Sequence, residues 1–284
     1  MQIACSFRGF NPVSNVFVLC KANFRWFAQL FMAIVRAAKA GSTHSLLKRF
    51  EVLKLLAAKV LPEYRFKWPQ MTWWHSENFN IYLDRFKERG GNNTDRRWLV
   101  SQLLRLIEDV PGDTVEVGCY RGAMSWLICE SNQQGTKRKM RVHHIFDSFE
   151  GLSEPGLDDG VHWQKGALAC SEAMVHANLA PFAGKFWTYK GWIPERFSEV
   201  ADFSFAFVHI DVDLHDPTME SLEFFYPRLS LGGILICDDY GFSSCLGATL
   251  ACDRYLADKP EAMVQLPDGG GFLIKGVTTA ANAY

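Results

Sequence analysis

Residues 205–240 read FAFVHIDVDLHDPTMESLEFFYPRLSLGGILICDDY, and this stretch decides the fold. Two apolar runs within it, 205–210 and 234–237, are short and rich in β-branched or aromatic side chains, which is typical of buried parallel strands. The residues between them predict a helix over 218–229, so the stretch forms a strand–helix–strand unit. The chain is therefore expected to contain an α/β sheet.

Each of these two strands ends in carboxylates. Asp211 and Asp213 follow the first strand, and Asp238 and Asp239 follow the second. Ligands of open α/β sheets bind at the carboxyl ends of the strands, where these side chains converge. Carboxylates in a partly dry cleft repel one another unless a cation or a proton intervenes. Magnesium is the simplest partner, since it takes one or two carboxylates and keeps positions for water and a substrate oxygen.

A glycine-containing loop lies earlier in the chain. The sequence EVGCYRG, with Glu116, Gly118 and Gly122, follows a predicted strand over 114–117 and opens a predicted helix over 121–131. Because glycine lets the backbone approach a ligand, this arrangement indicates a nucleotide-binding cradle. The motif has neither the dinucleotide spacing nor the lysine of a P-loop, and a plain strand–helix turn stays open as an alternative.

The next predicted strand, 142–146, strengthens the interpretation as a cradle. It ends in Asp147, and an acid at this place accepts hydrogen bonds from ribose hydroxyls. Together the two features predict a ligand that contains a nucleoside. The turn-rich residues 148–159 are expected to form a loop over the cleft.

The rest of the chain continues the alternation of helices and strands. The further predicted elements are helices over 24–39, 46–60, 96–108, 166–179 and 245–256, a strand over 186–189, and a hairpin of 262–266 with 272–275. Residues 1–94 are expected to form a helical extension or lid, and residues 95–284 the sheet domain. The Trp-rich segment with Trp68, Trp73 and Trp74 predicts a local core, and a substrate lid is the alternative.

Composition narrows the class of partner. The formal net charge of -1 gives no electrostatic basis for binding nucleic acid. The eight cysteines show no CxxC pair or zinc spacing, which favours reduced thiols in a cytoplasmic protein. Lys21, Arg25 and Arg36 interrupt the apolar stretch 13–40, so a helix that packs on the domain or on another subunit is favoured over a membrane span. A helix on a membrane surface is the alternative.

Five motifs resemble one family. VEVGCYRG, FDSFEGL, KGWIPERF, HIDVDLHDPTMESLEFFYPRLSLGGILICDDYG and GGGFLIK are similar to the macrocin O-methyltransferase (TylF-like) family of class I S-adenosylmethionine-dependent methyltransferases, which methylate sugar hydroxyls of macrolide and aminocoumarin antibiotics. The resemblance covers about residues 95–275. It implies a Rossmann-like fold, with a seven-stranded, mostly parallel sheet that ends in an antiparallel hairpin.

The resemblance also implies roles for individual residues. The implied contacts to S-adenosylmethionine are Glu116, Gly118, Tyr120, Gly122, Asp147, Ser148 and Asp211, and the implied ligands of Mg²⁺ are Asp211, Asp238 and Asp239. Asp213 matches the general base. His215 replaces an aromatic residue common in the family and is expected beside the metal as a further catalytic group, while His209 is an alternative base. Asp216 is expected to cap the following helix.

The resemblance therefore implies a magnesium-dependent O-methyltransferase that acts on a hydroxyl of a sugar or of another diol-containing metabolite. The protein is expected to be a cytoplasmic homo-oligomer that neither binds nucleic acid nor inserts stably into membranes. Two alternatives stay open. The acceptor is a catechol-like phenol or a small hydroxylated metabolite, or the chain is a scaffold that binds the nucleoside without catalysis.

Overall fold

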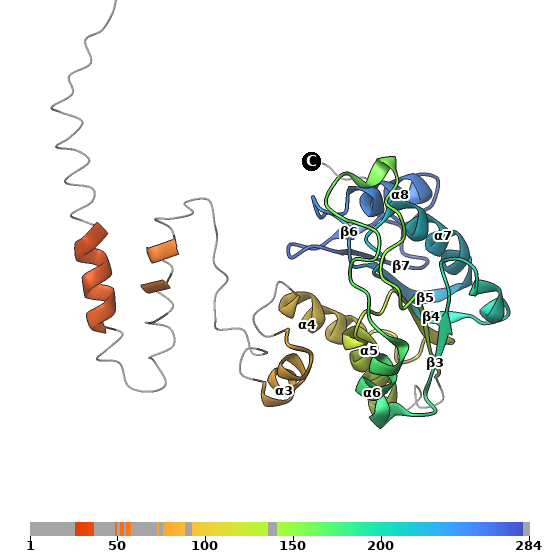
Figure 1. Cartoon of the computed structure of the whole chain (residues 1–284), viewed down its shortest axis with the longest axis horizontal. Coiled ribbons are helices and arrows are strands. Elements are labelled where there is room, and N and C mark those ends of the chain that lie inside the picture. The colour runs from red at the N-terminus through yellow and green to blue at the C-terminus, as the bar shows by residue number, and fades with distance from the viewer. Residues whose placement is uncertain are drawn as a thin grey trace, which may run out of the picture. The chain divides into compact units, whose positions relative to one another are not determined.

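The computed structural model describes residues 26–36, 49, 52–53, 55–57, 73, 76–88, 93–135 and 141–280. The chain divides into two compact units, Met1–Ser76 and Glu77–Tyr284. In the first unit, residues 26–36 form a helix (red in Figure 1), within the helix predicted over 24–39. The described residues between 49 and 57 are helical too, as predicted. Trp68 and Trp74 lie outside the described residues.

The second unit holds a seven-stranded sheet of order β3-β2-β1-β4-β5-β7-β6. The strands are β1 Asp113–Val117, β2 His143–Asp147, β3 Phe186–Lys190, β4 Phe205–Ile210, β5 Leu229–Cys237, β6 Val264–Gln265 and β7 Gly271–Ile274. The first five strands are parallel, and β7 pairs antiparallel with both β5 and β6. The predicted α/β sheet with a terminal antiparallel hairpin is confirmed.

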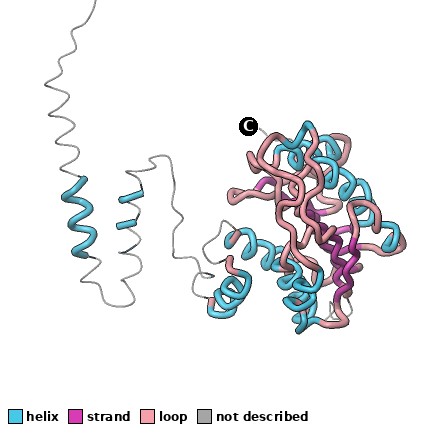
Figure 2. Tube along the Cα trace, viewed as in Figure 1, coloured by secondary structure: helices cyan, strands magenta, loops and turns pink. Residues whose placement is uncertain are grey.

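Helices cover both faces of this sheet. They are α3 Glu77–Phe86, α4 Thr94–Leu103, α5 Ala123–Gln134, α6 Glu172–Asn178, α7 His215–Phe225 and α8 Leu246–Leu256. Figures 1 and 2 show α5 and α6 on one side of the strands and α7 and α8 on the other. The α3 helix packs on this domain, because the Tyr82 hydroxyl donates to the Ala123 carbonyl at 3.0 Å. It therefore groups with the sheet, although the N-terminal extension was predicted to run to residue 94.

Several helix boundaries differ from the prediction for local reasons. α4 ends at Leu103, and turns replace the helix predicted up to 108. α6 begins at Glu172 and not at 166, because the Ser171 side chain accepts from the Met174 amide and caps the helix. α7 ends at Phe225, where a short 3₁₀ turn that contains a proline follows.

The start of α7 corrects the predicted role of Asp216. The helix begins at His215, one residue before Asp216 and three before the predicted start at 218. The His215 amide donates to Asp159 Oδ1 at 2.6 Å. Asp159, from a distant turn, therefore satisfies the helix N-terminus in place of Asp216. The same carboxylate explains a glycine in α8, since a Cβ at Gly247 would lie 1.9 Å from Asp159 Oδ1.

The largest part of the core lies between the sheet and the helices α7 and α8. All six residues of β4 are buried, as expected for a strand covered on both faces. Phe225 of α7 packs its ring against Phe146 and Phe205, with centroids 5.8 Å and 5.3 Å away. Full burial of one such side chain stabilises the fold by about 1.5–3 kcal/mol. These ring contacts pack α7 against β2 and β4.

Candidate active site

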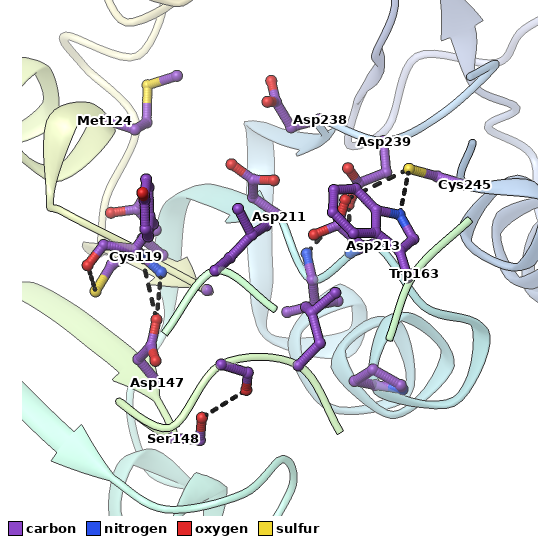
Figure 3. Close-up of a pocket in the computed structure, with 18 of the residues that line it drawn as sticks. Cys119, Met124, Asp147, Ser148, Trp163, Asp211, Asp213, Asp238, Asp239 and Cys245 are labelled. Atoms are coloured by element: carbon purple, nitrogen blue, oxygen red, sulfur yellow. Dashed lines mark hydrogen bonds between the residues drawn. The ribbon is translucent and has the colours of Figure 1, made fainter. Parts of the chain in front are cut away.

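A cavity of about 740 Å³ opens at the carboxyl ends of the parallel strands. This volume lies within the range of roughly 300–1,000 Å³ typical of small-molecule sites. Its lining includes the predicted residues Glu116, Gly118, Tyr120, Asp147, Ser148, Asp211, Asp213, Asp238 and Asp239. Figure 3 shows Asp147 and Ser148 on one side of it and Asp213, Asp239 and Cys245 on the other. Gly122 and His215 are not among the described residues that line it.

Two glycines shape the loop after β1. Gly118 has a φ of +82°, and a Cβ there would lie 1.9 Å from the Asp211 carbonyl oxygen. Glycine thus lets the end of β1 approach the end of β4 closely. Gly122 has a φ of +78° and caps α5 at its N-terminus. Both glycines therefore serve the backbone conformation that the predicted cradle requires.

Asp147 ties this loop to the end of β2. Its Oδ2 accepts from the amides of Cys119 at 2.8 Å and Tyr120 at 3.3 Å, and its Oδ1 accepts from the Phe149 amide at 2.7 Å. A carboxylate offers about four acceptor positions, so Asp147 retains capacity for a ligand hydroxyl. The neighbouring Ser148 hydroxyl is engaged in its own turn, where it donates to the Gly151 carbonyl at 2.8 Å.

Glu116 is a buried, ionised anchor below the loop. Its carboxylate accepts from the Ser125 hydroxyl. Burial acts to raise the pKa of Glu116, but interactions with His143 and His209 outweigh it and lower the pKa to about 2. Glu116 therefore stays charged at neutral pH.

His209 lies between Glu116 and the acids of β5. Its ring nitrogens are 3.4 Å from Glu116 Oε1 and 3.7 Å from Asp238 Oδ1. Burial acts to lower the pKa of His209, yet Asp238 and Glu116 raise it to about 10. His209 is fully buried and does not line the cavity, so this position gives it no direct contact with an acceptor as the alternative base.

The four aspartates of β4 and β5 form two neighbouring groups. Donor atoms of Asp211, Asp238 and His209 lie within 4.8 Å of one another, and so do those of Asp213, Asp239 and Cys245. The predicted metal ligands are thus in one cavity, although Asp239 points toward Asp213.

Backbone amides hold Asp239 in this orientation. Its Oδ2 accepts from the amides of Val212 at 3.1 Å and Asp213 at 2.8 Å. Asp213 itself has a φ of +60°, a left-handed conformation that costs a non-glycine residue about 1–3 kcal/mol. The Asp239 carboxylate thus supports the strained turn that presents Asp213 to the cavity.

The charges of these four acids are unequally compensated. Burial, followed by repulsion from Asp238, raises the pKa of Asp211 well above its ordinary value, and burial with repulsion from Asp213 does the same for Asp239. Burial and repulsion from Asp211 raise the pKa of Asp213 to about 7. Burial also acts to raise the pKa of Asp238, but Arg96 and other cations outweigh it and lower that pKa.

This donor set fits a hard divalent cation. In the described part of the chain, Arg96 and Arg97 form ion pairs with Asp238, whereas no arginine or lysine pairs with Asp211, Asp213 or Asp239, and carboxylate oxygens are the ligands that magnesium prefers. Ligand atoms of Asp211 and Asp238 lie within 4.8 Å of each other, and Asp239 follows Asp238 in the chain. The arrangement can therefore hold a cation at the floor of the cavity.

His215 lies away from these acids. Its Nδ1 is 2.7 Å from Asp216 Oδ1, and its Nε2 is 3.2 Å from an Arg254 nitrogen on α8. Its Nε2 is also 3.8 Å from Asp158 Oδ2. The structure thus places His215 in a polar cluster beside α8 and gives it no contact with the cavity, contrary to the expectation that it lies beside the metal.

Several site residues had no assigned role in the sequence. Trp163 donates its indole N–H to Cys245 Sγ at 3.4 Å, and that thiol donates to Asp213 Oδ1 at 3.4 Å. Trp163 follows the loop predicted over the cleft, so extending that loop by a few residues would have included it. Trp192 also lines the cavity and stands in the motif KGWIPERF. Arg96 pairs with Asp238, which lies 142 positions later in the chain, and nothing in the sequence near Arg96 indicates this contact.

Sequence comparisons find one family model and relatives named as O-methyltransferases. The sequence model of the macrocin-O-methyltransferase (TylF) family matches residues 99–260, which contain β1 to β5 and α8. The 8-demethyl-8-(2,3-dimethoxy-alpha-L-rhamnosyl)-tetracenomycin-C 4'-O-methyltransferase of Streptomyces olivaceus is 32% identical over 153 residues, 50% of this chain and 58% of that protein. The demethyldecarbamoylnovobiocin O-methyltransferase of Streptomyces niveus is 26% identical over 250 residues, 79% of this chain and 90% of that protein. The first match thus spans little more than half of its relative.

Solved structures share the fold. The O-methyltransferase NovP superimposes with a TM-score of 0.55 and 26% identity, over 64% of this chain and 80% of that one. A calicheamicin methyltransferase gives a TM-score of 0.59 at 21% identity, over 84% of this chain and 95% of its own. At 21% identity, the similarity to the calicheamicin methyltransferase shows a common fold only.

Proposed function

The chain belongs to the macrocin-O-methyltransferase (TylF) family, and from this membership we propose that it is an S-adenosylmethionine-dependent O-methyltransferase of glycosylated or other diol-bearing metabolites. One observation of the structure carries the proposal. Four carboxylates of β4 and β5 lie in the same cavity as the glycine loop and Asp147. A cofactor with a ribose and an acceptor with adjacent hydroxyls fit side by side in such a space.

The cofactor end of the cavity is formed by Gly118, Asp147 and the amides they organise. We assign the remaining acceptor capacity of Asp147 to the ribose hydroxyls, and the loop after Gly118 to the methionine part. The side chain of Tyr120 is 40% exposed at this loop and lines the cavity, so it offers an aromatic contact.

We further propose that Asp211, Asp238 and Asp239 hold Mg²⁺. When bound, S-adenosylmethionine supplies an electrophilic methyl group, and the cation supplies positive charge that lowers the pKa of a nearby hydroxyl. The chain's own residues then orient the acceptor and accept its proton. The raised pKa values of Asp211 and Asp239 support the cation, because burial and the neighbouring aspartates disfavour their charged forms, which a bound cation favours.

Asp213 is the proposed general base. Its Oδ1 accepts the Cys245 thiol, and its carboxylate lines the cavity, where it can take the proton of an acceptor hydroxyl. Burial and repulsion from Asp211 raise the pKa of Asp213 to about 7, which suits a base that works near neutral pH. Trp163 and Phe242 line the same space and supply apolar surface that excludes water and packs on a sugar ring.

The test is methyl transfer from labelled S-adenosylmethionine to a panel of acceptors, with Mg²⁺ or with a chelator. We expect transfer to glycosides with free adjacent hydroxyls, at a rate that the chelator lowers by at least about a hundredfold, since the charge of a metal ion lowers the barrier by several kcal/mol. Transfer to catechols alone would favour the phenol alternative. Binding of S-adenosylhomocysteine without transfer to any acceptor would favour the scaffold.

A further inference from the structure

We propose that Arg96 competes with the divalent cation for Asp238 and thereby sets the affinity of the site for that cation. The inference rests on the cation site of the proposed function. Arg96 comes from α4, and its Nη1 lies 2.5 Å from Asp238 Oδ2 and 2.9 Å from the Asp238 carbonyl oxygen. The guanidinium therefore occupies the carboxylate that is assigned to the metal.

One side of Arg96 borders the open cavity. Its side chain lines the cavity and stands 4.9 Å from the centre of the Phe242 ring. Its Nη2 also donates to Asn93 Oδ1, but its Nε is buried without an acceptor, so the present position leaves one donor unsatisfied. A swing toward the cavity gives that donor access to water or to an acceptor oxygen.

The neighbouring Arg97 also has one buried nitrogen, Nη1, without an acceptor, but its main ion pair lies elsewhere. It donates to both carboxylate oxygens of Glu88, at 2.9 Å and 3.3 Å, and its Nη1 is 3.8 Å from Asp238 Oδ2. Arg97 is thus anchored away from Asp238 by a two-bond ion pair, while Arg96 makes its short ion pair with Asp238 itself. Of these two arginines, Arg96 is the one that a cation displaces.

Electrostatics sets the competition at Oδ2, the Asp238 oxygen that Arg96 contacts. Asp238 has a side chain only 4% exposed, and like charges that share one of its oxygens repel strongly where little water screens them. A divalent ion at Oδ2 therefore requires the guanidinium to withdraw. In the metal-free protein Arg96 neutralises Asp238, which stabilises the cavity and weakens cation binding by the same interaction.

Calorimetric titration of Mg²⁺ into the full chain saturated with S-adenosylhomocysteine tests this. Arg96→Gln removes the competing charge and keeps a hydrogen-bonding side chain, so its Kd for Mg²⁺ is expected to fall about tenfold, one charge-assisted contact being lost from the metal-free state. Arg96→Lys keeps the charge and is expected to stay within about threefold of the parent. Arg105→Gln is the matched control, because Arg105 is exposed and contacts Gln102, and it leaves the Kd unchanged.

A second readout needs no turnover. Without metal, Arg96→Gln is expected to melt below the parent, and Mg²⁺ raises its melting temperature by more than that of the parent. The gain in affinity disappears when Asp238→Asn is added, because the contested oxygen loses its charge. An Arg96→Gln variant that binds Mg²⁺ no more tightly than the parent overturns the inference. A parent enzyme that binds Mg²⁺ but methylates nothing contradicts only the proposed function.

Discussion

Asp213→Asn is expected to lower kcat by about 10²–10⁴-fold, the range that a positioned general base contributes. The substitution keeps the size of the side chain and an oxygen that can accept the Cys245 thiol. It removes the basic oxygen that faces the cavity. The proposed function assigns cofactor binding to the loop after β1 and to Asp147, so the Kd for S-adenosylhomocysteine is expected to stay within about twofold. Steady-state kinetics with calorimetry separates the two effects.

Asp258→Asn is the matched control for this variant. Asp258 follows α8, its side chain is 79% exposed, and its contact is with Lys259. Its kcat is expected to stay within about threefold of the parent, since exposed ion pairs contribute little. Loss of less than tenfold in Asp213→Asn would move the role of base to another group.

Gly118→Ala is expected to lower the free energy of unfolding by about 3–5 kcal/mol, from overpacking and an unfavourable φ together. The added Cβ would lie 1.9 Å from the Asp211 carbonyl oxygen, which is backbone and cannot rotate away. The ends of β1 and β4 must separate, so the cavity distorts as well. The loss is a large part of a typical total of about 5–15 kcal/mol. Urea denaturation followed by circular dichroism measures it.

Gly184→Ala separates the two causes. Gly184 has a similar φ of +77°, but nothing lies within 4 Å of a Cβ built there. This variant is expected to lose only about 1–2 kcal/mol, the cost of the left-handed backbone. Equal losses in the two variants would show that close approach of β1 and β4 contributes nothing.

The sheet and its acids could be predicted because their signals are local. Short apolar runs bounded by turn residues mark β4 and β5, and the acids follow them directly in the chain. Parallel pairing then brings Asp211 and Asp238 to one edge without further information. The start of α6 was misplaced because a side-chain cap at Ser171 overrides the apolar pattern before it.

The rest of the site depends on contacts between distant segments. His215 contacts Asp158 and Arg254, and no residue spacing near position 215 indicates these contacts. The ion pair of Arg96 with Asp238 joins α4 to β5 in the same way. The lid role of residues 1–94 and assembly into a homo-oligomer stay predictions. Among the described helices, none is long and apolar enough to cross a membrane.

The most direct test of the account is a crystal structure with S-adenosylhomocysteine and Mn²⁺, with anomalous diffraction used to locate the metal. We expect a single anomalous peak in the cavity, coordinated by oxygens of Asp211, Asp238 and Asp239, with Arg96 withdrawn from Asp238. A cavity that holds the nucleoside but no metal, with Arg96 still paired to Asp238, would contradict the claim that these carboxylates bind a cation.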